Sequence, residues 1–171
     1  MHVKKNKCIP KDSIIGKSFG IPDYYDAYSI DIHSKSLGTV DYLFSKFSSV
    51  SPAWMQALMK LRNFLMSFIG LKTGKLDTVS ENDLKEGCRI GFFIITARNE
   101  NEIVFGEDDK HLNFESSLLL RRNHENAELY SITIVKFHNF TGRAYFFFVK
   151  PFHQLIILAV LRRLANSVDE S

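Results

Sequence analysis

The sequence has few of the residues that build covalent or metal-stabilised folds. Only two cysteines occur in its 171 residues, and the spacing between Cys8 and Cys88 matches no metal or redox motif. Isolated thiols are typical of proteins from a reducing compartment. We therefore expect a cytoplasmic protein in which these two cysteines are not joined by a disulfide.

Long apolar runs are also missing. The longest aliphatic run, LIILAVL at residues 155–161, is much shorter than the ~20 residues that a helix needs to span a bilayer. Residues 1–20 contain several lysines but no sustained apolar segment, so they do not predict a signal peptide. From these two absences we expect a soluble protein with no membrane partner.

The glycine-rich motifs of nucleotide-binding proteins and hydrolases are absent. Neither G-x-G-x-x-G nor G-x-S-x-G occurs, and GLKTGK at residues 70–75 is one residue too short between its glycines for a P-loop. RAYFFFV at residues 143–149 resembles the aromatic strand of RNA-recognition modules, but such modules have helices between their strands. The formal net charge of +3 is also small. We expect no cofactor and no nucleic-acid partner.

Phenylalanine, by contrast, is abundant, with 15 residues. The hydrophobic content of 45% and the charged content of 24% are those of a globular protein, and a chain of this length buries roughly two-thirds of its unfolded surface. Aromatic rings must therefore fill much of the core or line a cavity. We predict a single domain over residues 1–171, with an N-terminal extension at 1–20 and a core at 23–166.

The first half of the core predicts one strand followed by two helices. Residues 23–32, DYYDAYSIDI, are rich in tyrosine and isoleucine, which favour a strand. Thr39 is a suitable N-cap for a helix over residues 40–49, and Ser51-Pro52 indicates the start of a second helix. The apolar stripe of that second helix consists of Trp54, Leu58, Leu61, Leu65 and Phe68.

After Gly87 the apolar period changes from 3.6 to about 2 residues. Five strand-like runs follow, separated by short polar turns, at residues 89–97, 102–107, 111–121, 127–137 and 143–150. Pro151 ends the last run, and residues 154–166 predict a closing helix that is apolar nearly all round. We expect this helix to pack against the sheet, with buried positions that include Leu155, Leu158, Ala159 and Leu161.

This order of elements predicts an α+β fold in which a curved antiparallel sheet wraps around a long C-terminal helix, with two helices after the first strand. It resembles the helix-grip fold of the START and Bet v 1-like (SRPBCC) superfamily. In that fold a cavity lies between the sheet and the terminal helix, so the resemblance implies a site at the same place.

Residues 136–153, KFHNFTGRAYFFFVKPFH, contain the main candidates for a binding site. In one interpretation, His138, Arg143, Tyr145 and His153 are the polar groups of an otherwise apolar pocket. Arg143 and Tyr145 would then share one face of the last strand. In the other interpretation, these residues are part of a turn, a surface charge and a hydrogen-bonding group at the start of the closing helix.

The acidic turn GEDDKHL at residues 106–112 is a second candidate. Glu107, Asp109 and His111 could bind a divalent metal, whereas the alternative is a tight turn in which aspartate caps backbone amides. Because no second histidine follows at metal-ligand spacing, we predict no metal. Asp109 and His111 stay candidate ligand-binding residues, together with Trp54 of the second predicted helix.

From residue 23 to residue 166 the sequence resembles a bacterial family known as domain of unknown function 2867. The resemblance rests on five segments in this order and spacing: SPAW, GLKTG, RIGFF, GEDDKHL and KFHNFTGRAYFFFVKPFH. It implies the helix-grip fold that the order of elements also indicates. It brings no established activity, substrate or catalytic residue.

Together these features favour a protein that binds a hydrophobic or aromatic small molecule in an apolar, aromatic-lined cavity. His138, Arg143 and Tyr145 would orient the polar end of that molecule. One alternative is an enzyme of the cyclase or isomerase kind, in which a histidine or an acidic residue moves a proton beside a carbonyl group. Another is an interaction module with a filled core and no ligand.

Overall fold

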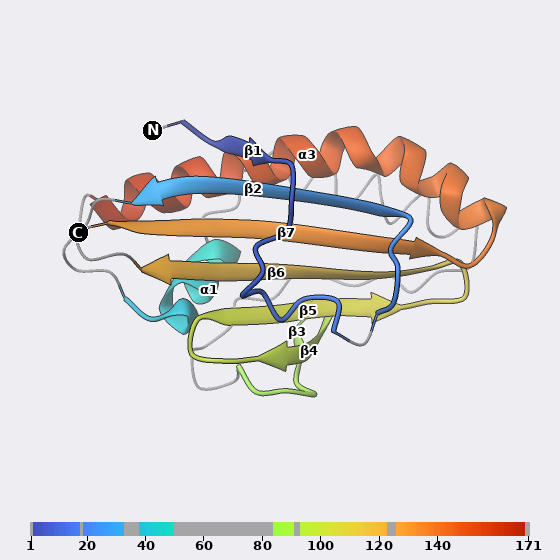
Figure 1. The fold of residues 1–171 in the computed structure, drawn as a ribbon, viewed down its shortest axis with the longest axis horizontal. Helices are drawn as coiled ribbons and strands as arrows, with labels where there is room; N and C mark the ends of the chain where they lie inside the picture. The colour runs from blue at the N-terminus through green and yellow to red at the C-terminus, as the bar shows by residue number, and fades with distance from the viewer. Residues whose placement is uncertain are drawn as a thin grey trace.

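The structure is a computed structural model that describes residues 2–17, 19–32, 38–49, 84–90, 93–122 and 126–169. Its described strands form one antiparallel sheet in the order β1-β2-β7-β6-β5-β4-β3 (Figure 1). The elements are β1 (Lys4–Asn6), β2 (Tyr24–Ile32), α1 (Val40–Ser49), β3 (Arg89–Ile90), β4 (Phe93–Arg98), β5 (Glu102–Asp108), β6 (Leu112–Arg122), β7 (Ala127–Phe137) and α3 (Phe140–Asp169).

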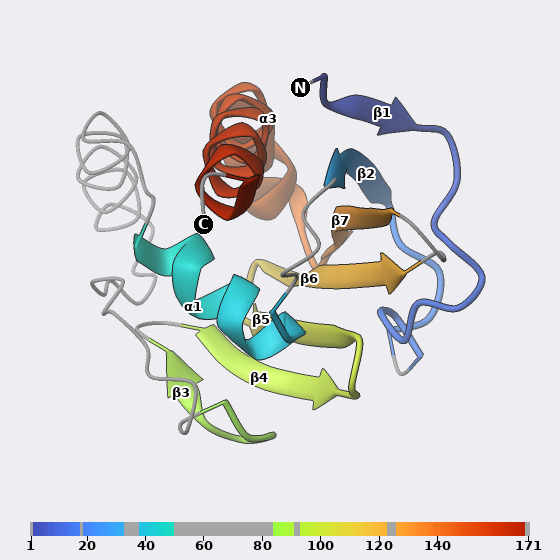
Figure 2. The same cartoon turned by 90° about the vertical axis from the view of Figure 1, so that its left-hand side faces the viewer.

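The two described helices lie on the same face of the sheet, which we call the helix-facing side. There α3 runs along β2 and β7, while α1 packs against β5 and β6 (Figure 2). Successive side chains of a strand point to opposite faces, so the alternate residues Tyr28, Ile30 and Ile32 of β2 enter this core. Leu161 and Leu164 of α3 meet them, and both are fully buried.

The N-terminal segment, described at residues 9–17 and at Phe19, lies on the opposite face of the sheet. Ile15 and Phe19 pack there against a second apolar cluster of the sheet. Two buried glutamates hold the segment in place. Glu102 accepts hydrogen bonds from the Ser13 hydroxyl and the Ile14 amide, both at 2.6 Å. Glu115 accepts one from the amide of residue 16 at 3.1 Å. The segment that the sequence suggests is an extension therefore forms part of the core.

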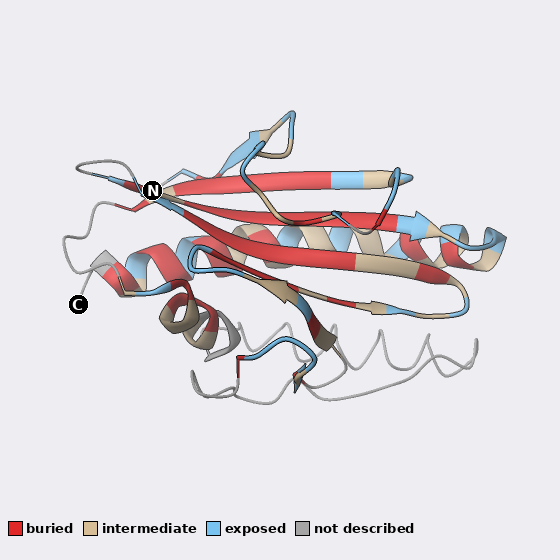
Figure 3. Ribbon diagram, turned by 60° about the horizontal axis from the view of Figure 1, so that its bottom comes forward, coloured by how far each residue is buried: buried red, intermediate tan, exposed pale blue. Residues whose placement is uncertain are grey.

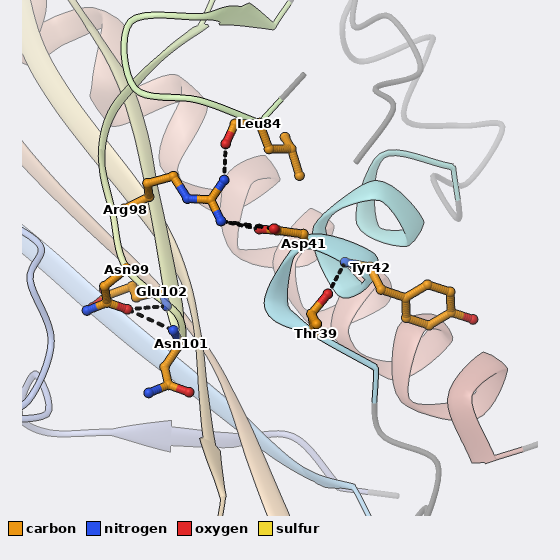
Figure 4. Close-up of polar contacts among 8 residues, drawn as sticks. All are labelled: Thr39, Asp41, Tyr42, Leu84, Arg98, Asn99, Asn101 and Glu102. Atoms are coloured by element: carbon orange, nitrogen blue, oxygen red, sulfur yellow. Dashed lines mark hydrogen bonds and ion pairs between the residues drawn. The ribbon is translucent and has the colours of Figure 1, made fainter. Parts of the chain in front are cut away.

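Arg98 joins α1 to the edge of the sheet (Figure 4). Its guanidinium donates to both carboxylate oxygens of Asp41 at 2.9 Å and also to the carbonyl oxygen of Leu84. Both hydrogen bonds to Asp41 come from one terminal guanidinium nitrogen, and the other terminal nitrogen donates to Leu84, so this side chain holds two segments at once. The predicted N-cap of α1 is confirmed, because the Thr39 hydroxyl accepts a hydrogen bond from the Tyr42 amide at 3.2 Å.

The start of α3 differs from the sequence prediction. The predicted strand at residues 143–150 is wrong, because one helix runs from Phe140 to Asp169 with Pro151 inside it. Asn139 caps this helix: its side-chain oxygen accepts a hydrogen bond from the amide of residue 142 at 3.0 Å. The cap and the packing on the sheet outweigh the strand propensity of the aromatic run. Buried positions recur at helical spacing, namely Phe146, Ile157, Val160, Leu161, Leu164 and Val168.

The helix is buried on one side and exposed on the other (Figure 3). Leu161 is fully buried, as predicted, and Leu158 and Ala159 are partly buried. The prediction that Leu155 is buried is wrong, since this side chain is 57% exposed. The sequence prediction failed here because an apolar helix shows no polar stripe that would mark its exposed face.

The remaining elements agree with the predicted fold class. The run predicted at residues 89–97 contains two described strands, β3 and β4, which pair antiparallel with each other. The α+β class is confirmed: a curved antiparallel sheet packs against a long C-terminal helix in a helix-grip-like arrangement. The second predicted helix, at residues 51–70, lies outside the described residues.

Replacing Leu161 by Ala should lower the free energy of unfolding by ~2–5 kcal/mol, because a fully buried leucine would leave a cavity. Leu155→Ala is the matched control on the exposed side of the same helix, and we expect a change within about 0.5 kcal/mol. Denaturant unfolding followed by circular dichroism measures both values. Equal losses for the two variants would contradict this orientation of α3.

Candidate functional site

A strip of polar side chains crosses the helix-facing side of the sheet. Asp26 of β2 lies opposite Thr133 of β7, which in turn lies opposite Ser116 of β6. All three residues are buried, and the hydroxyl oxygens of Ser116 and Thr133 are 3.0 Å apart. The strip separates two apolar clusters, one that contains Tyr28 and one that is bordered by Tyr24. It therefore interrupts the core directly below the helix layer.

Asp26 is the charged residue of this strip, and it is 3% exposed. The Tyr24 hydroxyl donates to its Oδ2 at 2.6 Å, and that hydroxyl accepts a hydrogen bond from the Gln154 side-chain amide at 3.1 Å. The second carboxylate oxygen, Oδ1, is buried and has no hydrogen-bond partner in the described part of the chain. A buried acceptor without a partner costs about 1–3 kcal/mol, so Asp26 is not explained by packing alone.

Helix α3 places His153 opposite this carboxylate. The imidazole Nε2 is 3.6 Å from Asp26 Oδ2, a distance at which a protonated imidazole forms an ion pair but no hydrogen bond. This Nε2 is also buried without a hydrogen-bond partner among the described residues. A carboxylate and an imidazole thus face each other across the contact between helix and sheet, and each has unused hydrogen-bonding capacity.

Tyr24 holds the first half of α3 over the strip. Its ring packs against Phe146 with the centroids 4.7 Å apart, and the Lys150 Nζ lies 4.8 Å from the ring centroid. Burial, followed by the hydrogen bond to Asp26, raises the pKa of the Tyr24 hydroxyl well above its usual range. Burial and the charge of Asp26 also raise the pKa of Tyr28.

We call Asp26, His153, Tyr24 and Gln154 the Asp26 site. Its carboxylate can accept a hydrogen bond, and its imidazole can donate or accept one, or transfer a proton. One carboxylate and one imidazole are too few for a closed metal site. No group of three or more histidine, cysteine, aspartate or glutamate side chains suited to a metal occurs within the described ranges.

Two of the predicted site residues, His138 and His111, lie at the end of the sheet instead. The His138 Nε2 is 2.8 Å from an Asp108 carboxylate oxygen, and the His111 Nδ1 is 3.1 Å from the Asn139 side-chain oxygen. The Asn139 amide also donates to the Lys110 carbonyl oxygen at 3.0 Å. These contacts join the β5–β6 turn to the start of α3.

Asp109 belongs to the same turn. Its carboxylate accepts a hydrogen bond from the Lys110 amide at 2.6 Å, and its own amide donates to the Leu112 carbonyl oxygen at 3.0 Å. This is the tight acidic turn that the sequence offered as the alternative to a metal site. The helix approaches the turn so closely that a Cβ on Gly142 would overlap the His111 carbonyl oxygen.

Arg143 and Tyr145 do not share a face, because residues two positions apart in a helix are rotated by about 200° from each other. The exposed Arg143 lies 3.7 Å from an Asp23 oxygen and 5.6 Å from the Phe137 ring centroid. Tyr145 packs against the cluster of Leu112, Val135 and Phe146. Trp54 lies outside the described residues. Of the predicted site residues that the structure describes, His153 alone lies in the Asp26 site, and a ligand role for the others stays a prediction.

Sequence reasoning missed Asp26, Tyr24 and Gln154. The signal for Asp26 was present, because it occupies the same face of its strand as Tyr28 and Ile30. A charged residue on the packed face of an otherwise apolar strand needs a partner. Tyr24 and Gln154 carry no comparable signal, because their roles depend on how α3 is placed.

A separate hollow of about 670 Å³ lies on the other side of the sheet. It is wide open to solvent. Two of its charged groups are already in contact with each other: Arg121 pairs with Asp12 at 3.0 Å, and Arg121 also lies 5.8 Å from the Tyr130 ring centroid. We therefore place the candidate site at Asp26 and not at this hollow, which is lined by Asn6, Lys7, Cys8, Ile9, Pro10, Lys11, Asp12, Arg121 and Tyr130.

The raised pKa of Tyr24 predicts a loss of stability at alkaline pH. Tyrosines of the unfolded chain ionise near pH 10, whereas Tyr24 stays protonated in the folded protein, so the free energy of unfolding falls as pH rises above about 10. Tyr24→Phe should make this fall less steep between about pH 9 and pH 11. Tyr28→Phe should act in the same direction. Unfolding curves measured across that pH range give the slope of the free energy of unfolding against pH. Slopes equal to that of the wild-type protein in both variants would contradict the raised pKa of these tyrosines.

Comparison with known proteins gives a family and no activity. The model of the family described as "Protein of unknown function (DUF2867)" matches residues 18–160. No curated protein matches the chain. A solved structure of a conserved protein from Geobacillus kaustophilus is similar at 16% sequence identity with a TM-score of 0.43, over 86% of this chain and 97% of that chain. The family model covers most of the sequence, so the chain belongs to the DUF2867 family, as the resemblance predicted.

Proposed function

We propose that the protein binds a small apolar or aromatic molecule at the Asp26 site, with a hydroxyl or N–H group of that molecule hydrogen-bonded to Asp26. The observation that carries the proposal is that two facing side chains of this one site each have a buried atom, Asp26 Oδ1 and His153 Nε2, with no hydrogen-bond partner among the described residues. Buried polar atoms in native proteins are nearly always hydrogen-bonded, and exceptions call for an explanation. A ligand with one polar group supplies the missing partner for both atoms.

The charge of the site restricts the chemistry of the ligand. A neutral hydroxyl group can donate to Asp26 and accept from the protonated nitrogen of His153. A carboxylate would instead meet the negative charge of Asp26, so an acidic ligand is disfavoured. On both sides of the polar strip the flanking groups are aromatic, with Tyr28 on one side and Tyr24 and Phe146 on the other. They favour a flat or apolar body for the molecule.

This assignment moves the polar contact away from the start of α3. Arg143, which the sequence suggested for orienting the ligand, is exposed and lies against Asp23 and Phe137. Asp26 and His153 take over that role in the proposal. The expected ligand is narrowed accordingly, from any hydrophobic or aromatic small molecule to a neutral one with a hydrogen-bond donor.

Three related compounds test the proposal: 2-naphthol, naphthalene and 2-naphthoate. We expect 2-naphthol to bind most tightly, because it alone combines the apolar body with a neutral hydroxyl donor. Asp26→Asn should weaken binding of 2-naphthol by about tenfold or more, since a hydrogen bond to a charged group contributes ~1.5–3 kcal/mol. Isothermal titration calorimetry measures each affinity, and the melting temperature of each variant checks that it is folded.

Arg143→Ala is the control, and it should bind 2-naphthol as the wild-type protein does. Loss of binding in Arg143→Ala with normal binding in Asp26→Asn would place the site at the start of α3 instead. Equal affinity of the wild-type protein for 2-naphthol and naphthalene would contradict a hydrogen bond at Asp26. No measurable binding of any of the three compounds would contradict the proposed ligand class.

The contact between Asp26 and His153 also favours a second function, proton transfer. The imidazole Nε2 would take a proton from the carbon beside a ligand carbonyl, and the carboxylate at 3.6 Å would stabilise the imidazolium that forms. Return of the proton to the same or a neighbouring carbon completes an isomerase-type reaction. Incorporation of deuterium into the methyl group of acetophenone in D2O, followed by NMR, tests this step. A rate equal in the wild-type protein and in His153→Gln would exclude it.

The relation to the helix-grip superfamily of START and Bet v 1-like proteins is part of the same proposal. Its support is the order of the described elements, in which the first long strand, β2, is followed by α1, then by an antiparallel meander and a long last helix. The Asp26 site lies between that last helix and the sheet, where the superfamily resemblance implies a ligand.

A further inference from the structure

The face of α3 that points away from the sheet is apolar over its first half. Phe147 is 75% exposed, Phe148 62% and Leu155 57%, and their spacing of one, seven and eight residues places them on one side of the helix. The two phenylalanine rings contact each other, with the centroids 5.6 Å apart. We call the following exposed residues the outer stripe: Phe140, Phe147, Phe148, Pro151, Phe152 and Leu155.

The outer stripe is the reverse of what a helix packed on a sheet normally shows to water. Such helices turn charged or polar residues outward, and a contiguous exposed apolar patch marks an interaction site. Exposure here is also selective. The neighbouring residues on the inner side of the same turns, among them Phe146 and Ile157, are buried. The stripe is therefore a separate surface and not an edge of the core.

By length and composition, α3 is the one helix among the described residues that could cross a membrane, from Phe140 to Val168. Only 22% of its most apolar window is buried, so it is not an ordinary core helix. Its inner face is nevertheless packed on the sheet, with Leu161, Leu164 and Ala165 fully buried. A helix that crossed a bilayer would give up these contacts, whereas one that lies along a bilayer surface keeps them.

The charges on α3 favour an anionic partner. Between Phe140 and Val168 the helix carries Arg143, Lys150, Arg162 and Arg163 and no acidic residue. Arg143 lies near the start of the outer stripe, and the exposed pair Arg162 and Arg163 follows its end by two turns. An apolar stripe with basic residues at both ends is the pattern of helices that bind in the plane of an anionic membrane surface.

We propose that the outer stripe docks on the surface of a bilayer that contains anionic lipids. Phenylalanine and leucine side chains enter the boundary between headgroups and acyl chains, and the arginines contact lipid phosphates. The expectation of no membrane partner rested in part on the short aliphatic run at residues 155–161. That basis no longer holds, because residues 143–150 are helical and extend the apolar helix back to Phe140. The inference does not depend on a ligand at the Asp26 site.

A second copy of the chain fits the outer stripe less well. If two stripes packed antiparallel about Pro151, Arg143 of one copy would lie within about one helical turn of Arg162 of the other. The same contact would repeat at the other end of the pair by symmetry. Like charges placed together at both ends oppose this dimer, whereas lipid phosphates neutralise them.

Co-sedimentation with vesicles tests the proposal. The wild-type protein should bind vesicles of phosphatidylcholine and phosphatidylglycerol at least tenfold more tightly than vesicles of phosphatidylcholine alone, and added salt should reduce the difference. The double variant Phe147→Ser/Phe148→Ser should lose at least tenfold in binding to the anionic vesicles. The double variant Arg162→Gln/Arg163→Gln should weaken binding to the anionic vesicles and leave binding to phosphatidylcholine vesicles unchanged.

Ile21→Ser is the matched control, because Ile21 is 88% exposed and lies outside α3. This variant should bind vesicles as the wild-type protein does. All substituted side chains are exposed, so unfolding curves should stay unchanged and exclude misfolding as the cause. Equal vesicle binding by the wild-type protein and the Phe147→Ser/Phe148→Ser variant would overturn the proposal, as would no binding to anionic vesicles.

A fluorescent label locates the contact. In a background with Cys8→Ser and Cys88→Ser, a nitrobenzoxadiazole label on Phe148→Cys should shift to the blue with anionic vesicles, and a label on Thr96→Cys, exposed on β4, should not. Without vesicles, the two introduced cysteines, at positions 96 and 148, should react with a water-soluble maleimide at similar rates. Protection of Phe148→Cys at that stage would mean that the protein itself covers the stripe. Light scattering tests for a second copy: a wild-type dimer that becomes a monomer in the Phe147→Ser/Phe148→Ser variant would assign the stripe to that copy. Protection of the cysteine or such a dimer would overturn the proposal.

Discussion

The contact of Tyr24 with α3 determines where the groups of the Asp26 site lie. Its ring holds the first half of the helix, and its hydroxyl connects Gln154 to Asp26. Asp26 comes from the first long strand and His153 from the last helix, so their separation of 3.6 Å depends on this single placement of α3. A slip of the helix by one turn would move His153 by about 5.4 Å and separate the pair.

The buried acids on the two sides of the sheet show what is unusual about Asp26. Glu102 receives a hydrogen bond at each of its oxygens from the N-terminal segment, and Glu115 binds a backbone amide of the same segment. These glutamates have a structural role, because they fasten one layer to another. Asp26 is as deeply buried, yet one of its oxygens has no partner among the described residues. The two glutamates that fasten the N-terminal segment are thus hydrogen-bonded, whereas Asp26 Oδ1 is not, and this difference supports another role for Asp26.

Most of the sheet could be predicted from the sequence, because alternating apolar residues and polar turns are local signals. β7 has the predicted bounds of 127–137, and β5 and β6 lie within one residue of theirs. The first part of α3 could not be predicted in this way, since RAYFFFVK has the aromatic content of a strand and Pro151 usually ends a helix. His153 was found by its place near the start of the closing helix. Its partner was not, because the pairing of Asp26 with His153 exists only once the helix is seated on the sheet.

The outer stripe and the Asp26 site lie on the same turns of α3. Phe147, Phe148 and Phe152 face outward, while Lys150 and His153, which alternate with them, reach toward Tyr24 and Asp26. The backbone of these turns is weakened at position 151, because proline has no amide to donate to the carbonyl of residue 147. The helix therefore lacks one of its own hydrogen bonds in the turns that carry the outer stripe on one side and His153 on the other. The outer stripe and the contact between His153 and Asp26 thus share one short piece of backbone, and a change in how these turns are placed would alter both surfaces.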